Sequence, residues 1–177
     1  REPLTIGTLS GFDGYLRHKS FFGKLYTQTI WNKYYNLLKD INFDFKKLDF
    51  PAVGNQSGVK INNKVITYET LRHAYHATEL NTLIKNIEKP VIVEIGGGLG
   101  GMAYQTFKLS NKKEQKYYIF DIPEVLTLCA FFLIAALPEK KICLFGEKVN
   151  NDTDYDIILM PYFLIHNIEN LKIDCFY

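Results

Sequence analysis

From Val91 onward, short apolar runs alternate with segments that have the composition of helices. The runs are VIVEI, KYYIFDI, KICLFG, YDIILMP and KIDCFY, and most of their residues are apolar. Strands of this kind are typical of a parallel sheet whose two faces are both covered. Parallel strands joined by crossovers place their carboxyl ends, and any ligand, at one edge of the sheet. The pattern therefore predicts a doubly wound α/β domain over residues 90–177.

The segments between these runs predict two helices. One runs from about Leu99 to Leu109, and the other begins near Pro123 and contains the longest apolar run, VLTLCAFFLIAALP. A membrane-spanning helix needs about 20 apolar residues. This run has 14 residues, from Val125 to Pro138, so we expect a helix buried inside the protein and no membrane span.

Residues 1–89 predict a mainly helical extension with a short hairpin. VKINNKVITY indicates the hairpin, and Thr67 occupies the N-cap position of a helix whose apolar face runs from Leu71 to Ile87 and which Pro90 closes. An earlier amphipathic helix of about 18 residues is predicted by apolar positions three and four residues apart. Those positions are Phe22, Leu25, Tyr26, Thr29, Ile30, Tyr34, Leu37 and Leu38.

Composition excludes several partners. The net charge is +2 and the lysines are scattered, so no nucleic-acid partner is expected. Cys129, Cys143 and Cys175 form no CxxC pair and lie in apolar surroundings, which favours buried reduced thiols and a cytoplasmic location. Because the chain lacks an initiator Met and stops inside KIDCFY, we expect a piece of a longer protein whose sheet is truncated at the C-terminus.

The glycine-rich loop after VIVEI fits two cofactor motifs. Gly96, Gly98 and Gly101 match G-x-G-x-x-G, the dinucleotide fingerprint, whereas Glu94, Gly96, Gly98 and Gly100 match E-x-G-x-G-x-G, the loop of S-adenosylmethionine-dependent methyltransferases. Both motifs need glycine because a backbone without Cβ can turn sharply and approach a ligand closely. The glycines by themselves leave both cofactors open.

Glu94 favours S-adenosylmethionine. It lies one residue before the end of its strand, where dinucleotide folds usually keep an apolar residue and where a carboxylate is costly without partners. In a methyltransferase it would brace the loop near the cationic methionine end of the cofactor. A dinucleotide fingerprint also usually opens its domain, whereas some 90 residues precede this one.

Asp121 supports a nucleoside cofactor of either kind. It ends YYIFD, 27 positions after Glu94, at the carboxyl end of the next strand. From there a carboxylate can accept hydrogen bonds from the two hydroxyls of a ribose. The alternative interpretation is a helix-capping or turn residue ahead of IPE.

VIVEIGGGLGGMAYQ, YYIFDIPEVLTLCAFFL and the terminal IDCFY resemble the sugar O-methyltransferase family, a branch of the S-adenosylmethionine-dependent class I methyltransferases. Upstream, Trp31 and ITYETLRHAY are similar to that family's lead-in. The resemblance implies a Rossmann-like fold, S-adenosylmethionine as methyl donor, and a hydroxyl of a sugar or glycan precursor as acceptor. The expected partner is therefore a small-molecule or glycan acceptor.

By motif match, the resemblance also implies cofactor-site roles for individual residues. It assigns them to Glu94, Gly96, Gly98, Gly100 and Asp121, and it suggests that Glu147, after the third strand in chain order, lies near the adenine.

Histidines offer weaker candidates. His166 in YFLIHNI could serve as a general base near the carboxyl edge of the sheet. His73 and His76, with Glu79, share one side of a helix, but zinc helices usually space their histidines four apart and a third histidine or a cysteine is missing nearby. We therefore predict no metal site.

The sequence thus predicts an S-adenosylmethionine-dependent O-methyltransferase acting on a sugar or glycan-precursor hydroxyl. Two alternatives remain open. One is an NAD(P)-dependent oxidoreductase or nucleotide-sugar enzyme, and the other is a non-catalytic methyltransferase-like module that binds a partner.

Overall fold

The computed structural model describes residues 21–51, 53, 59–61, 64–147 and 155–177. The chain divides into two compact units, residues 1–76 and residues 77–177. The boundary falls within helix α4 (Tyr68–Leu83), so each unit contributes one part of that helix.

The first unit contains helix α3, which spans Phe21–Asp40 and confirms the predicted amphipathic helix with 20 residues. A 3-10 turn, η1, covers Phe45–Lys47. Strands β1 (Val59–Ile61) and β2 (Lys64–Ile66) pair antiparallel, which confirms the predicted hairpin. The two residues between these strands, Asn62 and Asn63, lie outside the described residues.

Thr67 caps α4 as its sequence position predicts. The backbone N–H of Thr70 donates to Thr67 Oγ1 at 3.1 Å, and the backbone N–H of Thr67 donates back to Thr70 Oγ1 at 3.2 Å. This is the reciprocal pattern of a capping box, with a threonine hydroxyl in place of the usual Glu or Gln side chain. The two bonds satisfy backbone donors that the first helical turn leaves open.

The C-terminal end of α4 differs from the prediction. The helix ends at Leu83, whereas the apolar pattern predicted helix as far as Ile87. Beyond Leu83 the backbone tightens into a turn in which the N–H of Ile87 donates to the carbonyl of Ile84 at 3.0 Å. Lys112 Nζ donates to the carbonyls of Lys85 and Ile87, each at 2.6 Å. A distant lysine therefore satisfies carbonyl groups that a longer helix would have paired internally.

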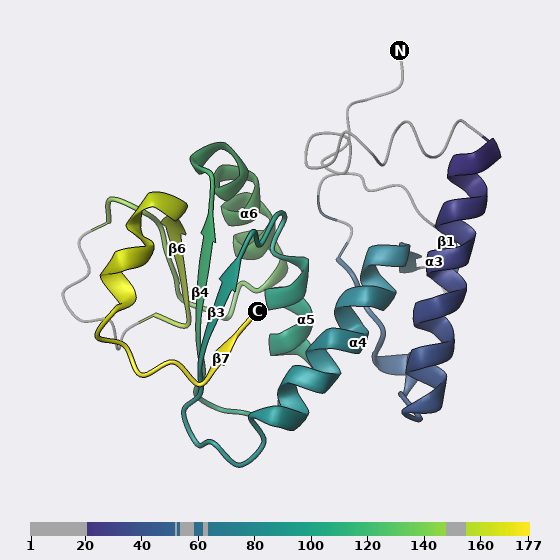
Figure 1. Cartoon of the computed structure of the whole chain (residues 1–177), viewed down its shortest axis with the longest axis horizontal. Helices are drawn as coiled ribbons and strands as arrows, with labels where there is room; N and C mark the ends of the chain where they lie inside the picture. Colours follow the sequence, from purple (N-terminus) through teal and green to yellow (C-terminus); the bar gives the residue numbers. More distant parts are fainter. Residues whose placement is uncertain (1–20, 52, 54–58, 62–63, 148–154) are drawn as a thin grey trace. The chain divides into compact units, whose positions relative to one another are not determined.

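The second unit is built on a five-stranded, all-parallel sheet of order β5-β6-β4-β3-β7 (Figure 1). Helices α5 (Gly101–Leu109) and α6 (Pro123–Ala136) follow β3 and β4. This confirms the predicted Rossmann-like α/β fold. Each strand lies within one of the five apolar runs that predicted it. The strands are β3 (Val91–Ile95), β4 (Lys116–Asp121), β5 (Ile142–Cys143), β6 (Ile157–Pro161) and β7 (Cys175–Phe176).

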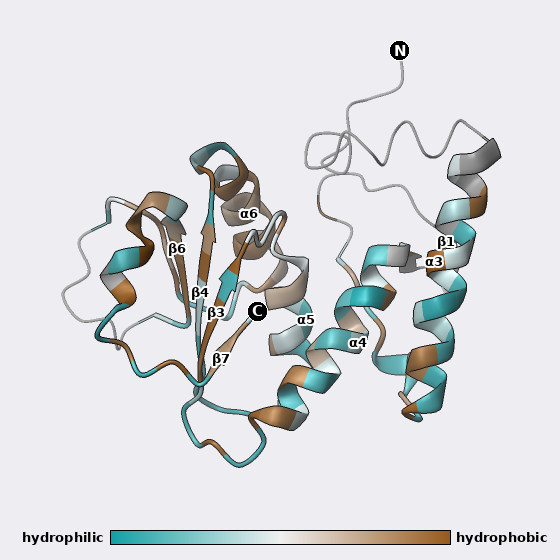
Figure 2. Ribbon diagram, viewed as in Figure 1, coloured by the Kyte–Doolittle hydropathy of each residue, from teal (hydrophilic) through white to brown (hydrophobic). Residues whose placement is uncertain are grey.

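Both faces of the sheet are covered, and its strands are largely hydrophobic (Figure 2). On one face, the rings of Tyr104 in α5 and Phe132 in α6 meet at 5.9 Å, and Phe107 in α5 lies 6.2 Å from Tyr117 in β4. The other face packs against η3, a 3-10 helix over Tyr162–Ile168. The buried cluster on that face comprises Val93, Tyr118, Phe120, Cys143, Ile158 and Ile168.

Helix α6 is less completely buried than its composition predicted. Its inner face is buried, but Phe131 and Ile134 are 57% and 51% exposed. Among the described residues, no helix is both long and apolar enough to cross a membrane. Of the three thiols, Cys129 and Cys143 are buried and Cys175 is partly exposed, so the expectation of burial was wrong for Cys175.

The strand order places a topological switch point beside β3. From β3 the sheet extends on one side through β4 and β6, whereas β7 pairs on the other side of β3. The N–H of Ile95 donates to the carbonyl of Tyr177 at 3.0 Å, next to the glycine loop. In open parallel sheets, ligands bind outside the carboxyl ends of the strands at such a switch point. The fold therefore places the glycine loop at the expected ligand edge.

The Thr67 cap is testable by substitution. Thr67→Ala removes the hydroxyl that accepts the N–H of Thr70, so the free energy of unfolding should fall by about 1 kcal/mol, measured by urea denaturation. Thr82→Ala is the matched control, because Thr82 Oγ1 is exposed and only donates back to the carbonyl of Thr78. Equal effects of the two substitutions would contradict the capping role.

Candidate cofactor-binding site

Three glycines of the loop adopt backbone conformations that other residues rarely reach. The φ angles are 77° at Gly96, 54° at Gly98 and 87° at Gly100. In this region a Cβ crowds its own backbone, which disfavours every L-residue. At Gly96 and Gly98 an added Cβ would meet no other atom within 4 Å. The backbone conformation therefore requires these two glycines, and open space surrounds each of them.

Packing requires glycine at two further positions. At Gly97 an added Cβ would overlap Ile119 Cγ2 and would lie 3.4 Å from Cδ and Oε2 of Glu94. At Gly100 it would lie 2.9 Å from Leu133 Cγ, within α6. The motif match missed Gly97, although the unbroken run GGG was the available signal. Gly97 makes room for the carboxylate beneath the loop.

Glu94 is buried in β3, with 4% of its surface exposed. Placing an ionised carboxylate in such a position costs free energy unless polar groups surround it. Burial raises the pKa of the Cys129 thiol far above its ordinary value, and the negative charges of Glu94 and then Asp121 raise it further. The thiol is therefore protonated and lies close enough to both carboxylates to feel their charge.

Asp121 and the glycine loop are joined directly. The N–H of Gly98 donates to Asp121 Oδ2 at 2.9 Å, and the N–H of Ile122 donates to Asp121 Oδ1 at 2.8 Å. Asp121 does not cap α6, whose N-cap is Ile122 without a side-chain cap bond. A carboxylate has about four acceptor positions, so both oxygens keep capacity for ligand hydroxyls. The structure thus brings together residues that are 23 positions apart in the sequence.

Neither His166 nor Glu147 makes a hydrogen bond or an ion pair with Asp121 or the glycine loop. His166 is exposed on η3, and its ring makes no hydrogen bond or ion pair with any described residue. Glu147 is exposed in a turn, where its Oε2 accepts the N–H of Leu144 at 2.8 Å. It follows the edge strand β5, and β6 separates that strand from β4. Pro161 at the end of β6, rather than a residue of β5, pairs with Asp121.

The histidine pair of α4 forms a polar group without metal-site geometry. Arg72 Nη2 lies 3.3 Å from His73 Nε2, and Tyr34 Oη lies 3.5 Å from His76 Nε2. Burial, then the charges of Arg72 and His76, lowers the pKa of His73 to about 3, so its ring is neutral at pH 7. The residue as a whole is only half-buried, but its Nδ1 is enclosed. In the described ranges, no three His, Cys, Asp or Glu side chains are grouped to hold a metal ion.

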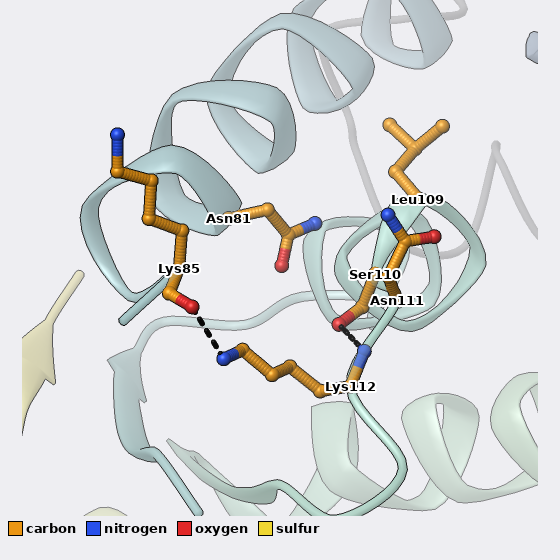
Figure 3. A pocket seen from close by; sticks show the side chains of 6 residues that line it. All are labelled: Asn81, Lys85, Leu109, Ser110, Asn111 and Lys112. Carbon is orange, nitrogen blue, oxygen red and sulfur yellow. Dashed lines mark hydrogen bonds between the residues drawn. The ribbon is translucent and has the colours of Figure 1, made fainter. Parts of the chain in front are cut away.

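A cavity of about 220 Å³ lies elsewhere in the second unit. Figure 3 shows it between the C-terminal end of α4 and the loop from α5 to β4. Since β4 begins after that loop, the cavity lies at the amino edge of the sheet, away from the glycine loop. Its lining residues are Asn81, Lys85, Leu109, Ser110, Asn111 and Lys112.

The site at the carboxyl edge therefore has three parts: a loop open to close approach, a buried carboxylate against it, and a second carboxylate at the next strand end. No protein-family model, curated protein or solved structure matches this chain significantly. Carboxylate acceptors beside a glycine turn suit a ligand that carries neighbouring hydroxyl groups.

The packing requirement at Gly100 predicts a difference between two glycines. Gly146 has φ 92° and open space around its Cβ position, so Gly146→Ala should cost about 1–2 kcal/mol from backbone strain alone. Gly100→Ala should cost about 1–3 kcal/mol more, because the methyl group also presses on Leu133. Urea unfolding of the two variants measures this difference. Equal losses in the free energy of unfolding would show that α6 moves to make room for the methyl group at no cost, and would contradict the packing requirement at Gly100.

Proposed function

We propose that this chain is the cofactor-binding part of an S-adenosylmethionine-dependent O-methyltransferase that acts on a hydroxyl of a sugar or glycan precursor. The hydrogen bond from Gly98 N–H to Asp121 Oδ2 carries the proposal. It places the acid suited to ribose hydroxyls directly against the loop suited to close approach. The resemblance of both segments to sugar O-methyltransferases supplies the choice of acceptor.

The residues present fit this cofactor. Asp121 would accept hydrogen bonds from the ribose hydroxyls, since both its oxygens keep acceptor capacity. The positive φ angles of Gly96 and Gly98 leave the loop without side chains where the ligand would approach. The Glu94 carboxylate would provide negative charge close to the loop. When bound, S-adenosylmethionine supplies an electrophilic methyl group attached to a sulfonium centre.

The chain's own contribution to such a reaction would be alignment and proton removal. Holding donor and acceptor in line can lower the barrier of a two-substrate reaction by several kcal/mol. A general base near the acceptor hydroxyl would add to this. His166 remains a candidate base, because its exposed ring is not engaged by any described residue.

One observation favours a dinucleotide instead. Helix α5 begins after Gly100, which adopts a left-handed conformation and provides no side-chain cap. A bare helix N-terminus at a glycine loop is well suited to a pyrophosphate. This second candidate, an NAD(P)-dependent oxidoreductase or nucleotide-sugar enzyme, gives no use to the buried carboxylate of Glu94. We therefore rank it below the methyltransferase.

Calorimetry separates the two candidates. The protein should bind S-adenosylhomocysteine and not NAD, and Asp121→Ala should weaken that binding by at least tenfold, since hydrogen bonds to a charged group are lost. Asp156→Asn is the control, because Asp156 precedes β6 at the opposite edge and bonds to the N–H of Lys141. Binding of NAD without binding of S-adenosylhomocysteine would overturn the proposal.

Glu94 provides an independent test. Glu94→Gln keeps the shape of the side chain and removes its charge, so the affinity for S-adenosylhomocysteine or S-adenosylmethionine should fall. The loss should be larger for S-adenosylmethionine, because only that ligand carries the sulfonium charge. Titration of both ligands measures the difference, and unchanged affinities would remove Glu94 from the site.

A further inference from the structure

Tyr117 is a fully buried tyrosine close to Glu94. In the parallel register of β3 and β4, Tyr117 pairs with Ile92 and Ile119 pairs with Glu94. Alternate residues of a strand share one face, so Tyr117 lies on the same face of the sheet as the carboxylate. None of the Tyr117 surface is exposed, and its ring packs near that of Phe107 in α5.

The side chains of Glu94 and Thr106 lie near the Tyr117 hydroxyl. Burial raises the pKa of Tyr117 well above its ordinary value, and the nearby Glu94 carboxylate and then the charge at Tyr177 raise the pKa further. Thr106 is the second neighbour, but its own hydroxyl already donates to the carbonyl of Met102 at 2.9 Å. The tyrosine stays protonated at neutral pH, and an ionised carboxylate is the stronger acceptor.

The contact between the Tyr117 hydroxyl and Glu94 is looser than a standard hydrogen bond. The hydroxyl is enclosed, yet no partner meets the distance and angle of a standard hydrogen bond. Hydrogen bonds in binding sites are often long before the ligand arrives and tighten when it binds. The carboxylate also lies against the loop at Gly97, within 3.4 Å of the position that a Cβ would occupy. A movement of the loop can therefore be transmitted to the carboxylate and from there to the hydroxyl.

We propose that Tyr117 is a positioning residue, whose hydroxyl donates to Glu94 and orients that carboxylate toward the cofactor side of the glycine loop. This inference rests on the proposed function, because it assumes that Glu94 acts on a bound cofactor. Tyr117 itself does not touch the ligand. Its effect on binding is exerted through Glu94 alone, and this distinguishes it from a tyrosine that only fills the core.

Tyr117→Phe tests this inference with a control in the same strand. Calorimetry should show an affinity for S-adenosylhomocysteine about tenfold weaker, which matches the lower end of the loss known for groups that orient metal ligands. The thermal midpoint of the unliganded protein should stay close to that of the wild type, since a poorly bonded buried hydroxyl contributes little stability. Tyr118→Phe removes a hydroxyl from the neighbouring buried residue, which faces the η3 cluster, and should leave binding unchanged.

A double-mutant cycle shows whether Tyr117 acts through Glu94. In the Glu94→Gln background, Tyr117→Phe should add less than a twofold loss, because the acceptor that it orients has already been altered. Full additivity would overturn the inference, and so would equal affinities of the Tyr117→Phe and Tyr118→Phe variants. If the wild type does not bind S-adenosylhomocysteine, the proposed function fails before this inference is reached.

A measurement on the unmutated protein covers the case in which Tyr117→Phe does not fold. With tyrosine labelled with ¹³C at Cζ, the Tyr117 resonance should shift on titration with S-adenosylhomocysteine as its hydrogen bond tightens. The Tyr118 resonance should not move. A stationary Tyr117 resonance in a protein that binds the ligand would contradict the inference.

Discussion

The parallel pairing of β3 with β4 is the constraint on which the rest of the site depends. Five successive residues of each strand pair, from Val91 with Lys116 to Ile95 with Phe120. Because the strands run the same way, the glycine loop and Asp121 emerge at one edge of the sheet. The hydrogen bond from Gly98 to Asp121 follows directly from that arrangement. An antiparallel pairing of the same two segments would place these groups at opposite edges.

The same arrangement supports a buried carboxylate, which is costly in free energy. Glu94 takes a position that would stabilise the fold better if it were apolar. The surroundings accommodate it through the missing Cβ of Gly97 and the hydroxyl of Tyr117. Its charge also reaches Cys129, whose thiol is kept protonated. Residues that depart from the apolar pattern of a core in this way are commonly found where a protein binds or reacts with a ligand.

Much of the second unit could be predicted from the sequence, because its strands are apolar throughout and its helices begin at recognisable residues. The start of α6 at Pro123 and, in the first unit, the cap at Thr67 are both local signals and both were correct. The end of α4 was predicted too late, since the carbonyls of Lys85 and Ile87, beyond the helix end at Leu83, accept from Lys112, a residue 25 positions beyond Ile87. Local patterns carry no information about such distant partners.

The order of the strands in the sheet could not be predicted from the sequence either. In the chain β5 follows β4, but in the sheet β6 lies between them. Both β5 and β6 are apolar, and crossover connections impose no pairing register that the sequence reveals. For this reason the sequence suggested a place near the adenine for Glu147, which follows β5. The strand that pairs with β4 beside Asp121 is instead β6, which ends at Pro161.

The sequence by itself determined the α/β class, the glycine loop and the two carboxylates, because these depend on residue type and on spacing along the chain. Only the tertiary structure decided that Asp121 bonds to Gly98, that Gly97 must be small and that Tyr117 lies by Glu94. Each of those contacts joins groups on different strands, helices or loops. Their distances are set by sheet register and by packing between layers, which no single segment of the chain specifies.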